Sequence, residues 1–235
     1  MILKENLFYL QERINKCCAA FHLNPSNITL VAVSKKQSID SILTLYHLGI
    51  RDFAENYVQE WLEKAKALSH LPDLRWHFIG HLQSNKVKFL HPQTSLLQSL
   101  DSLALAEKIS LWTKKNHSTL ECLVQLRIDK TQTSKTGIEA SNAKALCSYL
   151  QSNPNIRWRG FMGIGSQNSS NAETAKDFKE FYEQAMTLWK EFHPQNLISN
   201  EEKPIISLGM SEDLELALQA GSTLLRIGTA LFGQR

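Results

Sequence analysis

The sequence alternates between short apolar runs and longer amphipathic segments along almost its whole length. The short runs are bounded by turn formers, which is typical of strands, and the segments between them have helical spacing. Strands that alternate with helices form parallel sheets, because each helix carries the chain back to the edge where it started. The runs predict eight strands, at 28–33, 52–54, 76–79, 96–100, 120–128, 157–162, 205–208 and 224–227.

The segments between these strands predict helices. Gly49 and Gly221 follow two of them, where glycine allows the left-handed conformation that ends a helix. Eight strands without a linker-like break favour one closed (β/α)₈ barrel over an open doubly wound sheet, and 235 residues is near the roughly 250 typical of that barrel. We therefore expect an α/β fold with a single domain over residues 1–235. The helices are predicted at 38–48, 58–68, 85–90, 102–116, 141–150, 172–192 and 213–220.

The N-terminal segment predicts one further helix before the barrel. Leu3, Leu7, Leu10 and Ile14 recur at helical spacing, while charged residues interrupt any continuous apolar region. Nowhere does the chain approach the roughly 20 apolar residues that a membrane-spanning helix requires. Polar, turn-rich stretches at 131–136, 166–171 and 195–203 are expected to be flexible loops.

Charge and cysteine content narrow the class of protein. The 26 Lys and Arg are interleaved with 23 Asp and Glu, without the clustered basic face of a nucleic-acid-binding protein. The four cysteines form no C-x-x-C pair and no regular spacing, so neither a disulfide framework nor a zinc site is indicated. We expect a reducing, cytoplasmic setting.

The first predicted strand ends on two lysines, Lys35 and Lys36. In a (β/α)₈ barrel the functional groups come from the carboxyl ends of the strands. A lysine that points into the barrel mouth loses part of its hydration, which lowers its pKa from about 10.4 and makes the amine a nucleophile toward aldehydes. Lys36 is expected to face away from the mouth. The alternative is that both lysines are solvated, since lysine is rarely buried without a partner.

A second group of candidates follows the seventh and eighth strands. Loops at these positions, together with a short extra helix, form the usual phosphate site of this barrel. Ser211 and the Gly228-Thr229 pair lie there, although Ser211 is equally explained as a helix N-cap. Arg226 interrupts an apolar strand and needs a partner, either an acidic side chain or a ring nitrogen of a bound cofactor.

Other chemistries are disfavoured by spacing. His77 and His81 lie across a strand end and lack the glutamate of H-E-x-x-H, so no metal site is expected there. The stretch MGIGS lacks the third glycine of a dinucleotide fingerprint, and neither a Walker loop nor a G-x-S-x-G elbow occurs.

Six stretches carry a resemblance to a known family: AVSKK, AENYVQE, WHFIGHLQSNK, SKTGI, RGFMGI and SLGMSEDLELALQAGSTLLRIGTALFG. They resemble the YggS/PROSC family of pyridoxal 5′-phosphate (PLP) binding proteins, which are relatives of the alanine racemase N-terminal barrel. The resemblance covers residues 31–233, nearly the whole chain. It implies that Lys35 forms a Schiff base with PLP and that Arg226 faces the pyridine nitrogen. The remaining cofactor-binding positions that it implies are Asn56, His77, Met210, Ser211, Gly228 and Thr229.

The sequence departs from the family pattern at three positions. Ala54 stands where a glycine is usual, Gly165 replaces a usual proline, and Arg127 stands where an asparagine is common, in a loop that contains one extra residue. The last departure weakens any family role for the mouth of the fifth strand. From that loop we retain only Lys135, as a candidate contact.

The resemblance implies a PLP-binding protein of intracellular vitamin B6 homeostasis, which holds PLP as a lysine aldimine. We expect a cytoplasmic monomer that hands PLP to PLP-dependent apoenzymes, has no nucleic-acid or membrane partner, and has no established catalytic residue. An arginine opposite the pyridine nitrogen leaves the ring a weaker electron sink.

Two alternatives remain open. One is a PLP-dependent amino-acid racemase. Racemases of this barrel type receive a second acid/base group from another domain of a partner chain, and we expect no such domain here because the chain ends at Arg235. Tyr57, His77 or a cysteine would then have to supply the missing base. The other alternative is an interaction module with a vestigial pocket.

Overall fold

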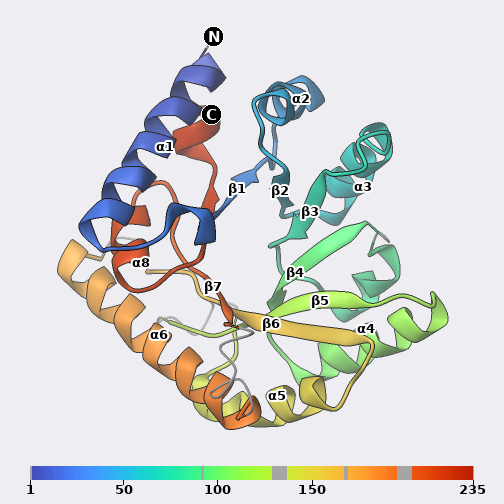
Figure 1. Cartoon of the computed structure of the whole chain (residues 1–235). Coiled ribbons are helices and arrows are strands. Elements are labelled where there is room, and N and C mark those ends of the chain that lie inside the picture. Colours follow the sequence, from blue (N-terminus) through green and yellow to red (C-terminus); the bar gives the residue numbers. More distant parts are fainter. Residues whose placement is uncertain (1, 91–92, 129–136, 167–168, 195–202, 235) are drawn as a thin grey trace.

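A computed structural model describes residues 2–90, 93–128, 137–166, 169–194 and 203–234. Figure 1 shows its strands arranged in a ring with helices around the outside. Each strand pairs in parallel with the next, and the first pairs with the last, so the predicted closed (β/α)₈ barrel is confirmed. The strands are β1 (Thr29–Val33), β2 (Asp52–Glu55), β3 (Arg75–Phe78), β4 (Thr94–Leu100), β5 (Leu120–Gln125), β6 (Ile156–Met162), β7 (Ile205–Ser207) and β8 (Leu224–Ile227).

The helices cover the outer faces of these strands. Gly49 and Gly221 both have φ +100° at the ends of helices, as their positions predict. The α-helices are α1 (Ile2–Ala20), α2 (Ile39–His47), α3 (Val58–Ala67), α4 (Leu103–Lys115), α5 (Lys144–Gln151), α6 (Asn171–Phe192), α8 (Leu214–Gln219) and α9 (Thr229–Phe232). Short 3₁₀ segments are η1 (Pro25–Asn27), η2 (Ser84–Phe89) and η3 (Ala140–Asn142). In the part of the chain that is described, every helix is too short or too polar to cross a membrane.

Three predicted elements differ from the structure in type or by three residues at one end, whereas the others differ by two residues or fewer. The helix expected at 85–90 is the 3₁₀ segment η2. At 6 residues it is too short to offset the free-energy cost of nucleating an α-helix. The strand expected at 120–128 ends at Gln125, because Leu126 and Arg127 pair instead with Ile138 across the base of the following loop. The helix expected at 141–150 begins only at Lys144, after η3.

The expected loops fall partly outside the described residues. All of 131–136 lies outside them, as do 167–168 and 195–202. Asn171, which we assigned to a loop, is instead the first residue of α6. Ser170 and Glu173 form a capping box there, which starts the helix.

Strand alternation divides the core into two parts. Side chains that face outward from the barrel, such as Phe53, Trp76 and Phe161, pack beneath the helices. A separate apolar cluster fills the barrel interior, and consists of Val31, Val33, Ala54, Leu96, Leu123, Met162 and Leu224. Because residues two apart in a strand share a face, this cluster identifies which polar residues of the same strands also face inward.

The predicted N-terminal helix α1 packs beside the last helices of the chain (Figure 1). Asn6 donates from Nδ2 to the carbonyl oxygen of Leu231, at 3.0 Å. Arg13 forms a bidentate ion pair with Glu215 and also reaches the carbonyl oxygen of Ser211. The helix therefore supports the segments that follow β7 and β8.

Candidate functional site

Lys35 lies two residues beyond Val33, at the carboxyl end of β1. Val31 and Val33 belong to the interior cluster, and extending their alternation by two residues past the end of the strand predicts that Lys35 points toward the barrel mouth. Lys35 is half-buried, while Lys36 is exposed with φ +61°, in the left-handed region that a lysine seldom adopts. The chain therefore turns sharply after Lys35.

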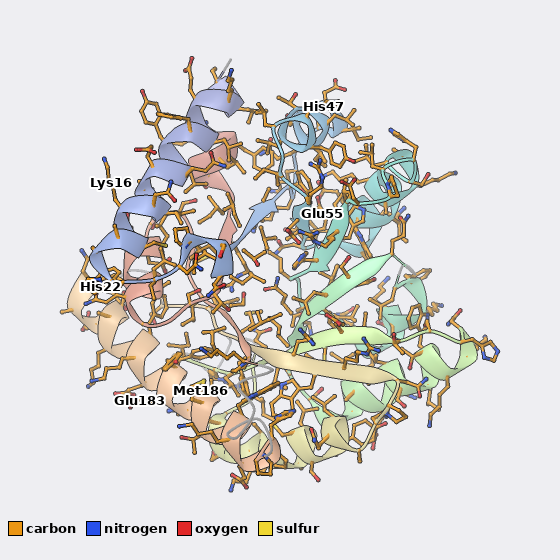
Figure 2. The ribbon with its side chains drawn as sticks, in the orientation of Figure 1. Lys16, His22, His47, Glu55, Glu183 and Met186 are labelled. Carbon is orange, nitrogen blue, oxygen red and sulfur yellow. The ribbon has the colours of Figure 1, made fainter. Side chains whose placement is uncertain are left out.

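A group of three charged residues, two of them buried, lies beside this turn on the outside of the barrel, and we call it the α3 ion cluster. It consists of Glu55, Glu60 and Lys64, and Figure 2 shows Glu55 on the side of the barrel covered by α2 and α3. Lys64 Nζ lies 2.8 Å from Glu55 Oε1 and 2.7 Å from Glu60 Oε1. Burial raises the pKa of the Glu55 carboxyl, and the hydrogen bonds from Lys64 and Ser34 oppose that rise only in part.

The α3 ion cluster binds the peptide groups on both sides of Lys35. Lys64 Nζ donates to the carbonyl oxygen of Ser34 at 2.7 Å, and the Ser34 hydroxyl donates to Glu55 Oε1 at 2.6 Å. The backbone N–H of Lys36 donates to Glu60 Oε1 at 2.5 Å. These contacts stabilise the left-handed turn and thereby fix the direction in which Lys35 leaves the strand.

Arg226 lies in the barrel interior with only 4% of its surface exposed. Its Nη1 donates to the carbonyl oxygen and to the hydroxyl of Ser207, at 2.8 and 2.5 Å, and its Nη2 donates to the carbonyl oxygen of Gly163 at 2.8 Å. Burial lowers the pKa of Arg226 to about 10, and the charge of Asp213 opposes that change, so the group stays protonated at neutral pH. Its partners are thus neutral oxygens, rather than the carboxylate that was one of our two expectations.

A guanidinium has five N–H donors. Three of those of Arg226 are used for Ser207 and Gly163. The other two, Nε–H and the second hydrogen of Nη2, have no partner among the described residues. These two N–H groups are held in place by the other contacts of the guanidinium, and they can donate to an acceptor atom of a bound ligand.

The candidates for a phosphate site meet at the carboxyl ends of β7 and β8. Ser211 Oγ accepts from the backbone N–H of Ala230 at 3.0 Å, so it caps α9 and not the helix that follows it in sequence, whose N-cap is Asp213. Gly228 and Thr229 begin α9. Met210 is 36% exposed, and its backbone N–H donates to Asp213 Oδ1. The structure therefore brings together the four residues that sequence analysis placed around a phosphate.

Asn56 and His77 occupy different depths. Asn56 Oδ1 is buried without a hydrogen-bond partner, at the edge of a cavity of about 370 Å³ that Tyr57, His81 and Phe89 also line. Its backbone is packed against Gly80, where a Cβ would lie 1.9 Å from the carbonyl oxygen of Asn56. His77 lies deeper, 4% exposed, and contacts Gln98 and Asp52 through its two ring nitrogens.

The departures from the family pattern fall at separate places. Ala54 fills the barrel interior. Gly165 lies against Phe178, since a Cβ there would be 3.0 Å from the Phe178 ring. Arg127 donates to the carbonyl oxygen of Gly137 at 3.2 Å and so joins the two ends of the loop that contains Lys135, which itself lies outside the described residues.

Sequence analysis missed the residues that support the candidates. None of the three residues of the α3 ion cluster was singled out from the sequence, although Lys64 and Glu55 are buried. Asp52, Gln98 and Ser207 are polar residues two positions from interior apolar ones in their strands. That spacing was a usable signal of inward-facing polar groups.

Comparisons with known proteins identify the family of this chain. The family model for the alanine racemase N-terminal domain matches residues 6–235. The pyridoxal phosphate homeostasis protein of Haemophilus influenzae is 34% identical over 100% of this chain and 97% of its own length. The protein of the same name from Aquifex aeolicus is 36% identical over 98% of this chain and 97% of its own. The chain belongs to the family of pyridoxal phosphate homeostasis proteins.

A solved structure has the same fold over its full length. PipY of Synechococcus elongatus, without PLP, is 32% identical, with a TM-score of 0.83 over 99% of this chain and 100% of that one. The same protein with PLP bound is 31% identical, with a TM-score of 0.80.

The residues of this homeostasis-family chain fit PLP on their own geometry. Its barrel mouth offers an amine at Lys35, two unpartnered donors of Arg226, and the unpartnered oxygen of Asn56. Ser211, Gly228 and Thr229 converge on one side of that mouth.

Proposed function

We propose that this chain binds PLP at the mouth of its barrel and acts in PLP homeostasis by holding the cofactor and releasing it to other proteins. The observation that carries the proposal is that β1, which ends two residues before Lys35, pairs with β8, which holds Arg226 and leads into the Gly228 segment that Ser211 caps. The names of the relatives and the PLP-bound form of PipY support it.

Each residue has a distinct task in this proposal. PLP supplies an aldehyde, which condenses reversibly with a primary amine and releases water. Lys35 supplies that amine from a turn that the α3 ion cluster fixes. Ser211 and Thr229 bind the phosphate through their hydroxyls, with the backbone of Gly228 close by. Arg226, which keeps its charge, donates toward the pyridine nitrogen and disfavours a proton there.

Binding without turnover is the form of the function that we propose. Of the bases considered for a racemase, His77 uses both ring nitrogens inside the barrel. Burial raises the pKa of the Cys147 thiol to about 12, with a further rise from the charge of Glu191, and burial raises that of Cys122 as well. Tyr57 alone among them lies exposed at the cavity that Asn56 borders. The racemase therefore remains a second candidate that rests on Tyr57.

The experiment that separates the two compares retention with turnover. Purified protein is loaded with PLP, freed from excess by gel filtration, and mixed with phenylhydrazine, which traps each PLP molecule that is released. In parallel, the loaded protein is incubated with L-alanine in deuterated water. We expect slow release of PLP and no exchange of the Cα proton. Exchange that persists over many turnovers and disappears in Tyr57→Phe would overturn the proposal in favour of the racemase.

A further inference from the structure

Five hydrogen-bonded contacts connect Arg226 to the opposite end of the barrel through its interior. Arg226 contacts Ser207, whose hydroxyl lies 2.7 Å from Gln98 Oε1. Gln98 Nε2 lies 2.9 Å from His77 Nδ1, and His77 Nε2 lies 3.0 Å from Asp52 Oδ1. The last contact is a bidentate ion pair between Asp52 and Arg75, with distances of 2.8 and 2.6 Å. We call these six residues the interior chain.

The interior chain runs between the two ends of the barrel. Arg226 follows Leu224 toward the carboxyl end of β8, while Asp52 and Arg75 are the first residues of β2 and β3. The five residues from Arg226 to Asp52 are each less than 10% exposed, whereas the Arg75 side chain is 54% exposed. One end of the chain thus lies at the candidate cofactor site and the other at the solvent.

The chain has a single direction of donation. Arg226 can only donate, so Ser207 Oγ accepts from it and its own hydrogen goes to Gln98 Oε1. The amide nitrogen of Gln98 can then only donate, and His77 must accept on Nδ1. The proton of His77 is therefore on Nε2, from which it donates to the carboxylate of Asp52.

Reversing Gln98 would break this order. With its amide turned around, the nitrogen of Gln98 would face Ser207 Oγ, which already accepts from Arg226, and the serine hydrogen would lose its acceptor. An unsatisfied buried polar group costs about 1–3 kcal/mol. Each member therefore fixes the orientation of the next, and the direction is anchored at Asp52, which accepts from both His77 and Arg75.

We propose that Gln98 and Ser207 are positioning residues that hold the guanidinium of Arg226 toward the cofactor, in an orientation set by the direction of the interior chain. This role rests on the proposed function, because it is the pyridine nitrogen of PLP that the remaining donors of Arg226 would meet. The interior chain itself is present in the protein without any ligand.

The first test uses the protein without PLP. Nitrogen-15 NMR of the His77 ring at pH 8 is expected to show an unprotonated Nδ1 and a protonated Nε2. Gln98→Glu replaces the donating amide by a second acceptor, so we expect Nδ1 to become protonated in that variant at the same pH. A wild-type Nδ1 that carries the proton would contradict the interior chain, and so would a Gln98→Glu ring with the wild-type pattern while carbon-13 NMR shows the introduced carboxyl to be ionised.

The second test measures binding of pyridoxine 5′-phosphate, which retains the pyridine nitrogen and the phosphate but has no aldehyde. Ser207→Ala removes one acceptor of Arg226, and we expect roughly tenfold weaker binding. Ser207→Thr keeps the hydroxyl and is expected to restore most of the affinity. Ser110→Ala is the matched control, because it removes an equally buried serine hydroxyl, bonded to Asn153 outside the barrel, and is expected to leave binding unchanged.

The two tests separate the possible failures. The side-chain NMR signals of Arg226 without ligand are expected to show restricted rotation in the wild type and in Ser110→Ala, and faster rotation in Ser207→Ala. If the wild type gives this pattern but binds neither pyridoxine 5′-phosphate nor PLP, the proposed function is wrong. The proposed role of Gln98 and Ser207 toward the cofactor is then wrong as well. If the ligands bind and Ser207→Ala matches Ser110→Ala, the positioning role is wrong while the proposed function stands.

Discussion

Lys35 follows β1 and Arg226 lies on the neighbouring strand β8, but the protein holds them in different ways. The α3 ion cluster lies outside the barrel and fixes Lys35 through the peptide groups of Ser34 and Lys36. Arg226 is fixed inside the barrel through its own side chain, by neutral oxygens. In the proposed function, the group that would form and break a bond with PLP is thus positioned through its neighbours, whereas the group that would keep a charge in one place is positioned directly.

The largest expected effect of breaking this arrangement follows from Lys64→Met. The change leaves Glu55 without its cation in a buried site, and removing one partner of a buried ion pair typically destabilises by about 3–5 kcal/mol. Urea unfolding at pH 7 measures the loss. Lys66→Met is the control, because Lys66 is exposed on the same helix. A loss in Lys64→Met as small as that in Lys66→Met would contradict a structural role for the cluster.

A smaller effect is expected at the other end of the interior chain, in Asp52→Asn. Burial alone would raise the pKa of Asp52, but the hydrogen bonds from Arg75 and His77 outweigh burial and lower the pKa from 3.8 to about 2. A carboxyl whose pKa is lower in the folded state stabilises the fold above its unfolded pKa, and the contribution is lost as pH falls from about 4 to about 2.

Asp52→Asn should therefore cost about 2 kcal/mol at pH 7 and much less near pH 2. Urea unfolding of both proteins across this range gives the difference directly. A difference between wild type and variant that stays constant with pH would show that Asp52 acts through packing rather than through its charge.

The smallest effect separates the backbone contact of Glu60 from its charge. Glu60→Gln keeps an oxygen that can accept from the Lys36 N–H, whereas Glu60→Ala removes it. Losing a hydrogen bond of about 1 kcal/mol predicts roughly fivefold slower condensation of PLP with Lys35 in Glu60→Ala, and a lesser change in Glu60→Gln. Stopped-flow absorbance measures the rate, with Glu63→Ala on the same helix as control. Equal rates in Glu60→Gln and Glu60→Ala would assign the effect to charge alone.

The fold was predictable from the sequence because it depends on local patterns. The period-2 and period-3.6 patterns located all eight strands, and 224–227 matches β8 at both ends. The strand at 120–128 was drawn too long because Leu126 and Ile128 are apolar, and nothing local shows that Leu126 pairs with Ile138 across a loop. Hydrophobicity indicates that a residue is buried, but it does not indicate which segment its backbone pairs with.

The site was predictable only in part for a related reason. Lys35 and Arg226 stand out because a charge interrupts or ends an apolar run. Gln98 and Ser207 come from strands 109 positions apart in the sequence, and each alone is an ordinary polar residue. Their contact arises only when the barrel closes, so a reading of successive segments does not reveal it.

The role of Lys35 is tested most directly by trapping the cofactor on the protein. PLP is added to the wild type, to Lys35→Ala and to Lys36→Met, each mixture is reduced with borohydride, and the modified peptide is mapped by mass spectrometry. We expect a single adduct on Lys35 in the wild type and in Lys36→Met, and no adduct in Lys35→Ala. An adduct on Lys36 or another lysine in the wild type, with Lys35 unmodified, would contradict the assignment of the cofactor site.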